Sequence, residues 1–190
     1  MILQTYDNSL EVPRITKITG IANIASIPLT SPWTLSFTEE SPKVKHTFSL
    51  DTLKSWETLD DDSAKVTMGT GIYTTHLKLS KADAQKQWQI DLGDVRESAR
   101  VYINGQFIGC AWCVPFILDC KNTLKQGNNE IRIEVTNLPA NRIAYLDRQG
   151  VKWRKMEEIN VVDINYKRTT YENWNPVPCG LNSQVRLIGK

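Results

Sequence analysis

The stretch from Trp88 to Thr136, WQIDLGDVRESARVYINGQFIGCAWCVPFILDCKNTLKQGNNEIRIEVT, decides the fold of this chain. Apolar and polar residues alternate in three runs within it, and this period of two predicts β-strands with one buried face. The Gly127-Asn128-Asn129 triplet before the third run is typical of a turn. We therefore expect successive antiparallel strands. The alternating apolar residues are Trp88, Ile90, Leu92, Ala99, Val101, Ile103, Ile131, Ile133 and Val135.

The Asn104-Gly105 pair lies between two of these runs. Asn-Gly is the strongest short-range signal for a tight type I′ hairpin turn, because both positions need a positive φ. With this turn, the aromatic pair of the hairpin would lie on one face of the sheet and the aliphatic pair on the other. The expected cross-strand pairs are Ile103 with Gln106, Tyr102 with Phe107, and Val101 with Ile108.

The order of motifs along the chain resembles a known family. A strand ending in DLGDV is followed by VYING, FIG, PFILD and LKQGNNEIRIEVTN. The segments 69–75 and 174–181 flank this core, and the second has Cys179 where serine is more common. This order resembles the sugar-binding domain of glycoside hydrolase family 2 and is similar to the β-sandwich of family 106 α-L-rhamnosidases. The resemblance covers most of residues 33–188 and implies an all-β fold, an antiparallel jelly-roll β-sandwich of the galactose-binding-like type.

The length of 190 residues is suited to one domain and too short for a (β/α)8 catalytic barrel of about 250 residues. We expect residues 1–30 to be an extended lead-in with at most one edge strand, and 31–190 to be a single jelly-roll domain. A net charge of +2 gives no argument for a nucleic-acid partner or an anionic membrane surface. No apolar run approaches membrane-spanning length.

The first residues lack the basic start, apolar core and cleavage site of a signal peptide. The resembling enzymes are usually exported and carry a catalytic barrel. The resemblance therefore implies a secreted or periplasmic parent protein in which a catalytic glycosidase domain is the partner of this one.

Further elements follow from the pattern and from turn residues. We expect Ser80 to Gln87 to form only a short turn, and residues 141–158 to form a helical or irregular excursion. The other predicted strands are 32–37, 46–50, 72–79, 159–166 and 184–188.

Cys110 and Cys113 have the CxxC spacing of a redox pair or of half a zinc site. Pro115 and the strand context oppose the helix that a redox pair needs, and Cys120 and Cys179 do not form a second close pair. The favoured interpretation is buried or half-buried free thiols in the core. Trp112, beside a core strand, is also expected to be buried.

The run Asp60-Asp61-Asp62 is the densest acidic cluster. A structural calcium ion would need several converging oxygen ligands. Consecutive carboxylates point apart, which favours a solvated turn. We therefore expect no cofactor.

Two segments after Thr136 break the strand pattern and concentrate aromatic and guanidinium groups. A sugar site needs an aromatic platform and planar polar side chains. The same residue types also pack loops or contact a neighbouring domain. The candidate sugar-binding residues are Tyr145, Asp147, Arg148, Trp153, Arg154, Tyr171 and Trp174.

No catalytic arrangement is evident in the sequence. Glu157 and Glu158 are adjacent, so they diverge and cannot flank a glycosidic bond at a separation of about 5 Å or more. The sequence therefore predicts a non-catalytic carbohydrate-binding or accessory domain of a glycoside hydrolase. The alternative is a purely structural interdomain β-sandwich with no sugar affinity of its own.

Overall fold

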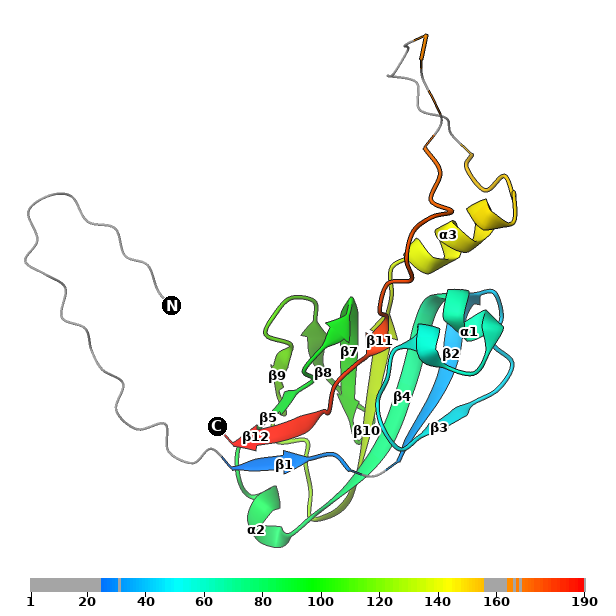
Figure 1. The fold of residues 1–190 in the computed structure, drawn as a ribbon. Helices are drawn as coiled ribbons and strands as arrows, with labels where there is room; N and C mark the ends of the chain where they lie inside the picture. Colours follow the sequence, from blue (N-terminus) through cyan, green and yellow to red (C-terminus); the bar gives the residue numbers. More distant parts are fainter. Residues whose placement is uncertain (1–24, 31, 156–163, 166, 168, 190) are drawn as a thin grey trace, which may run out of the picture.

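The computed structural model describes residues 25–30, 32–155, 164–165, 167 and 169–189, and it forms a β-sandwich (Figure 1). One layer contains β2 (Trp33–Ser41), β3 (Phe48–Leu50), β4 (Met68–Leu79), β7 (Ser98–Ile103), β8 (Gln106–Ala111) and β10 (Gly127–Thr136). These six strands are ordered β3-β2-β4-β10-β7-β8. The other layer has the order β1-β12-β5-β9, with β1 (Ser26–Pro28), β5 (Trp88–Asp91), β9 (Ile117–Asp119) and β12 (Arg186–Gly189).

All strand pairings in the described residues are antiparallel, which confirms the predicted fold class. The predicted lead-in strand is β1, which pairs with β12 at the sheet edge. Residues 1–24 lie outside the described part. A short pair, β6 (Val95–Arg96) with β11 (Gly180–Leu181), closes the sandwich beside the larger sheet.

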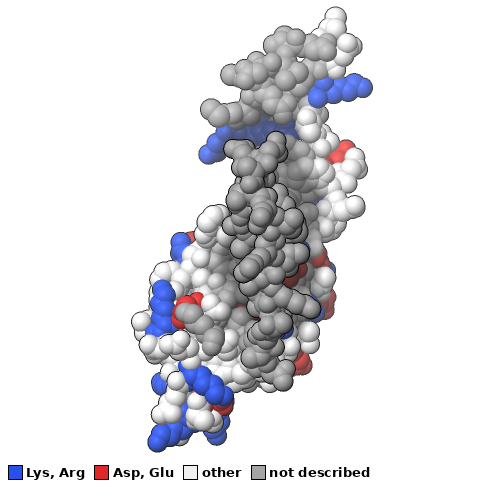
Figure 2. All heavy atoms as spheres, turned by 90° about the vertical axis from the view of Figure 1, so that its left-hand side faces the viewer, with Lys and Arg blue, Asp and Glu red and all other residues white. Residues whose placement is uncertain are grey.

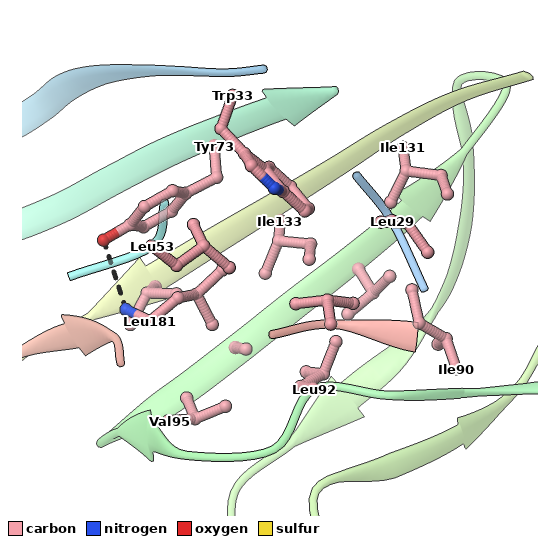
Figure 3. Packing of buried hydrophobic residues seen from close by; sticks show 14 of the residues in the cluster. Leu29, Trp33, Leu53, Tyr73, Ile90, Leu92, Val95, Ile131, Ile133 and Leu181 are labelled. Atoms are coloured by element: carbon pink, nitrogen blue, oxygen red, sulfur yellow. Dashed lines mark hydrogen bonds between the residues drawn. The ribbon is translucent and has the colours of Figure 1, made fainter. Parts of the chain in front are cut away.

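The core lies between the two sheets and is built from the alternating residues of the sequence pattern (Figure 3). All nine alternating apolar residues of the 88–136 stretch are buried, as predicted. From the other layer, Val185, just before β12, and Leu187, within it, are also buried. Burying such side chains contributes about 1.5–3 kcal/mol each. This burial is what specifies which face of every strand points inward.

The Asn104-Gly105 turn forms as predicted, with φ values of 52° and 79°. Ile103 pairs with Gln106 and Tyr102 with Phe107. The third predicted pair is wrong, because the register shifts and Val101 lies opposite Gly109. The extra residue forms a β-bulge, and it lets Ile108 and Ala111, three residues apart, both point into the core.

Replacing Gly105 with valine should destabilise the domain by about 1–3 kcal/mol, because a β-branched residue is strained at positive φ. A Cβ atom at Gly105 would meet nothing within 4 Å, so the cost comes from the backbone alone. The measurement is the midpoint of chemical denaturation. A midpoint equal to that of the wild type would contradict the turn assignment.

The predicted turn at Gly127-Asn128-Asn129 is wrong, because these residues already belong to β10. Asn129 is completely buried, and its side chain holds the loop that precedes β10 by hydrogen bonds. Its amide donates to the carbonyl of Lys125 at 2.8 Å and accepts from the Lys125 backbone N–H at 2.9 Å. A side-chain amide that bonds backbone in this way replaces hydrogen bonds that a turn would make.

The acidic run 60–62 leads into a helix that the sequence analysis did not predict. Asp61 is the N-cap of α1 (Asp62–Val66), and its carboxylate accepts from the Ala64 backbone N–H at 2.6 Å. Asx side chains favour this position because they satisfy a free helical N–H. Asp61 also lies 3.5 Å from the His46 imidazole. The acidic residues thus begin a helix at one end of the sandwich.

Two other short helices pack at the ends of the sandwich. Trp56 in the 3-10 helix η1 (Trp56–Thr58) is completely buried. The short turn predicted for 80–87 is α2 (Lys81–Ala84), capped by the hydroxyl of Ser80. Among the helices that the structure describes, none is long and apolar enough to cross a membrane.

The excursion predicted after Thr136 begins with α3 (Ala140–Arg148) and rises away from the sandwich before the chain returns through β11 (Figure 1). We call residues 140–178 the arm. Its described portions are 140–155, 164–165, 167 and 169–178. The predicted strand 159–166 lies largely outside the described residues, and 164–165 form a turn. Glu157 and Glu158 are also outside them.

Candidate functional site

Four of the seven candidate residues form an aromatic cluster in the arm. The Tyr171 ring lies 4.4 Å from that of Trp174 and 6.4 Å from that of Trp153, measured between centroids. The Arg154 guanidinium lies 5.1 Å from the centroids of both Trp153 and Tyr171. Such cation–π contacts stabilise by about 0.5–2 kcal/mol. The two sequence segments, separated in the chain, are thus brought together.

Asp147 holds the two segments of the cluster in place from α3. One carboxylate oxygen accepts from the Trp153 indole N–H at 2.6 Å, and the other accepts from the Tyr171 backbone N–H at 2.7 Å. Arg148, on the next position of the helix, donates to the carbonyl of Glu172 at 3.2 Å. These charge-assisted bonds join the segment that leaves the sandwich, which contains α3, to the segment that returns to it.

Tyr145 does not join the cluster. It lies under the Arg142 guanidinium, 5.5 Å from the ring centroid, and faces α1. Tyr145 and Arg142 line a recess of about 370 Å³ together with residues of α1. The structure therefore brings six of the seven predicted residues into one region and separates the seventh from it.

The cluster borders a shallow recess of about 250 Å³ between the two segments of the arm. Its lining includes Asp147, Lys152, Trp153 and Thr169. Trp174 is 48% exposed at the surface. Figure 2 shows Lys and Arg side chains at the upper end of the molecule, which carries the arm. Indole and phenol faces can stack on the C–H face of a sugar ring, and cationic side chains can donate to its hydroxyls.

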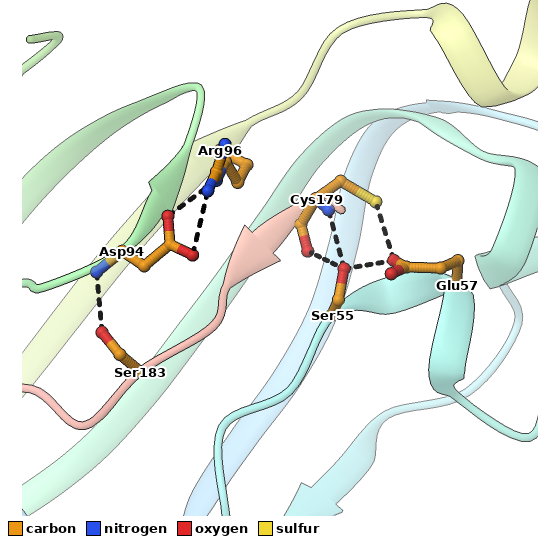
Figure 4. A network of polar contacts seen from close by, with 6 residues as sticks. All are labelled: Ser55, Glu57, Asp94, Arg96, Cys179 and Ser183. Carbon is orange, nitrogen blue, oxygen red and sulfur yellow. Dashed lines mark hydrogen bonds and ion pairs between the residues drawn. The ribbon is translucent and has the colours of Figure 1, made fainter. Parts of the chain in front are cut away.

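The base of the arm is fixed by polar contacts that the sequence analysis missed. Asn141 donates to the Val177 carbonyl at 2.8 Å and accepts from the Val177 N–H at the same distance. The Cys179 N–H donates to the Ser55 hydroxyl at 2.7 Å, and that hydroxyl lies against Glu57 (Figure 4). Ser55 and Cys179 are 124 residues apart, so no local pattern could have indicated this contact.

The sequence prediction for the cysteines is half right. Cys120 and Cys179 are buried free thiols, but Cys110 and Cys113 are exposed, which corrects their placement in the core. Trp112, also expected to be buried, is 74% exposed. The reason is that Cys110 lies on the outer face of β8, and Trp112 and Cys113 follow the last strand residue at the sandwich end.

Burial raises the pKa of Cys120 to about 12, with a contribution from the Asp119 charge. Burial, with the neighbouring Glu57 carboxylate, raises the pKa of Cys179 to about 11. Reactive thiols have a lowered pKa and partial exposure, and the buried Cys179 thiol has neither. Within the described ranges, no group of three or more His, Cys, Asp or Glu side chains could hold a metal ion.

A thiol-specific reagent should label Cys110 and Cys113 promptly in the folded protein and leave Cys120 and Cys179 protected. The reason is exposure together with the raised pKa of the buried pair. The measurement is mass spectrometry of labelled peptides, with the denatured protein as the control in which all four react. Prompt labelling of Cys179 would contradict the packed base of the arm.

Comparison with known proteins gives the fold an evolutionary context. The family model described as "Glycosyl hydrolase 2 galactose-binding domain-like" matches residues 55–179. A putative beta-glucuronidase of Formosa agariphila is 27% identical over 184 residues, and the match covers 89% of this chain and 16% of that protein. The chain therefore spans about a sixth of the length of this relative.

Solved structures show the same fold. A rhamnosidase from Novosphingobium sp. PP1Y matches with a TM-score of 0.68 and 22% identity, over 90% of this chain and 16% of that one. A beta-D-glucuronidase from Dictyoglomus thermophilum matches with a TM-score of 0.60 and 16% identity, over 88% and 28%. The matching domain is thus a minor part of each larger glycosidase. Because the family model matches residues 55–179, which are more than half of this chain, the chain belongs to the glycosyl hydrolase 2 galactose-binding domain-like family.

Proposed function

We propose that this chain is a non-catalytic accessory domain of a glycoside hydrolase and that its arm contacts carbohydrate beside a catalytic domain. The observation that carries the proposal is the aromatic cluster of Trp153, Tyr171 and Trp174 with Arg154 between two of its rings. The arm that carries this cluster projects from the sandwich and is anchored at its base by hydrogen bonds of Asn141 and Cys179. A rigid aromatic surface of this kind loses little side-chain entropy when a sugar ring stacks on it.

The chemistry of the cluster suits a saccharide. The partly exposed indole of Trp174 supplies an apolar face, and the Lys152 ammonium borders the adjoining recess. One such contact surface supports weak binding, with a dissociation constant of ~0.1–1 mM, or roughly 4–5.5 kcal/mol. Weak contacts of this size increase the local concentration of a polymer near a catalytic domain.

The second candidate function is bracing of a neighbouring domain without sugar affinity. This second function is favoured because polar side chains of the arm form hydrogen bonds with other residues of the arm. Both Asp147 oxygens accept hydrogen bonds from arm residues, and Arg148 and Arg154 donate to arm carbonyls. Groups engaged in this way contribute to the rigidity of the arm, which serves a protein contact equally well.

Replacing Trp174 with alanine tests the two functions. We expect loss of oligosaccharide binding, at least tenfold, with an unchanged fold, because the ring is about half exposed. Titration of rhamnose- and galactose-containing oligosaccharides is followed by NMR amide shifts, and Trp112→Ala is the matched control, since Trp112 is exposed outside the arm. If millimolar oligosaccharide shifts no arm amide in the wild type, the sugar-contact function is rejected in favour of bracing.

A further inference from the structure

The recess beside Tyr145, of about 370 Å³, lies where α3 approaches the end of the sandwich that carries α1 (Figure 1). Its volume falls within the ~300–1,000 Å³ of typical small-molecule sites. Pro42 and Val66 line it from the sandwich side, and Arg142 and Tyr145 line it from α3. The recess therefore joins an apolar wall to a guanidinium group and a phenol ring.

The Arg142 guanidinium lies in this recess without an anionic partner. It packs over the Tyr145 ring, 5.5 Å from the centroid, and within the described part of the chain it forms no hydrogen bond and no ion pair. A guanidinium has five N–H donors, and withdrawing such a group from water without a partner costs free energy. The Arg142 side chain is only half-buried and lines the recess, so a ligand can reach these donors.

The charges around the recess favour a ligand with one negative charge. Two cations and one anion line it, so the net charge of its lining is +1. The Lys65 ammonium is paired within α1, where its Nζ atom lies 3.1 Å from the Asp62 carboxylate. The charge left over is that of Arg142, and a single negative charge neutralises it. A guanidinium also forms two parallel hydrogen bonds to a planar carboxylate, so a monocarboxylate matches this group in both charge and shape.

We propose that this recess binds a small organic acid with one carboxylate and a flat apolar body, such as an aromatic monocarboxylate. The carboxylate accepts hydrogen bonds from the Arg142 guanidinium, and the apolar body packs against Pro42 and Val66. The Ser63 and Tyr145 hydroxyls also line the recess, and neither makes a hydrogen bond within the described residues, so both can donate to the ligand. This ligand class differs from the oligosaccharide proposed for the arm, and the two proposals are tested separately.

Benzoate is the probe for this site, with benzamide as its neutral analogue and D-glucuronate as a carboxylate without an apolar ring. The ¹⁵N-labelled protein is titrated with each compound, while the Arg142 side-chain Nε–H and the backbone amides of Ser63 and Tyr145 are followed by NMR. For a ligand of about nine heavy atoms we expect a dissociation constant on the order of 1 mM. The shifts should saturate with benzoate, and the other two compounds should bind at least tenfold more weakly.

Arg142→Gln should weaken benzoate binding at least tenfold, because it removes the charge and the paired donors. Arg100→Gln is the matched control and should bind benzoate like the wild type, since Arg100 is exposed on β7 and does not line the recess. The denaturation midpoint shows whether each variant is folded. If Arg142→Gln does not fold, the comparison of benzoate with benzamide on the wild type decides. The proposal is overturned if benzoate shifts no recess resonance, if benzamide or glucuronate binds as tightly, or if folded Arg142→Gln binds no more weakly than Arg100→Gln.

Discussion

Replacing Gly180 with alanine should destabilise the domain by about 2–6 kcal/mol, because the backbone conformation and the packing at this position both oppose an added methyl group. Gly180 has a φ of +88°, a backbone conformation that costs an L residue about 1–3 kcal/mol. An added Cβ would lie closer than 3.0 Å to the indole of Trp56 and to the hydroxyl of Tyr73. Both are fully buried and cannot move aside, and such overpacking costs about another 1–3 kcal/mol.

Gly105→Ala is the matched control for this variant. Gly105 also has a positive φ, of 79°, but a Cβ there would meet no atom within 4 Å. The difference between the two free energies of unfolding therefore isolates the steric contribution at Gly180. Equal losses in the two variants would mean that the contact between β11, Trp56 and Tyr73 is not as tight as the structure has it.

Replacing Tyr73 with phenylalanine should destabilise the domain by about 2–6 kcal/mol, although it removes a single oxygen atom. The hydroxyl accepts from the Trp56 indole N–H at 2.6 Å and from the Leu181 backbone N–H at 3.1 Å. Both donors are completely buried. Removing the shared acceptor leaves two unsatisfied donors, each costing about 1–3 kcal/mol.

A tyrosine hydroxyl is protonated at neutral pH, and burial raises the pKa of Tyr73 further, so the network is not lost by ionisation of this group. Tyr102→Phe is the control, since Tyr102 is half-buried on the outer face of the larger sheet. Chemical denaturation of both variants gives the comparison. A loss below about 0.5 kcal/mol for Tyr73→Phe would show that water or another group satisfies the two donors.

The strands were the most predictable part of the molecule, because alternation follows directly from burying one face. The residues from Trp88 to Leu92 and from Ile131 to Val135 are inward at every second position, as the pattern indicated. The Asn104-Gly105 turn was equally predictable, since few other residue pairs adopt positive φ twice in succession.

The exposure of the CAWC segment was not predictable from its composition. Cys110, Trp112 and Cys113 are residue types that are often buried, yet all three face outward. The cause is the β-bulge at Ile108, which changes the direction of the residues that follow it, and the end of β8 at Ala111. A bulge depends on the fit to the neighbouring strand and leaves no signal in its own residues.

For the arm, the sequence indicated which residues matter and the structure decided what they do. The aromatic and guanidinium groups of 145–154 and 171–175 stood out because they break the strand pattern. Their pairing required the Asp147 carboxylate to join Trp153 to Tyr171, and it required α3 to direct Tyr145 elsewhere. Whether the resulting surface binds a sugar stays a prediction.

By itself, the sequence determined the β-sandwich class, the inward faces of the central strands and the tight hairpin turn. Each of these depends on residues a few positions apart, where the period of the backbone alone sets direction. Only the tertiary structure decided the register bulge, the close contacts around Gly180 and Tyr73, and the anchored arm. These join positions such as Ser55 and Cys179, which are 124 residues apart, and such contacts depend on packing complementarity between distant segments.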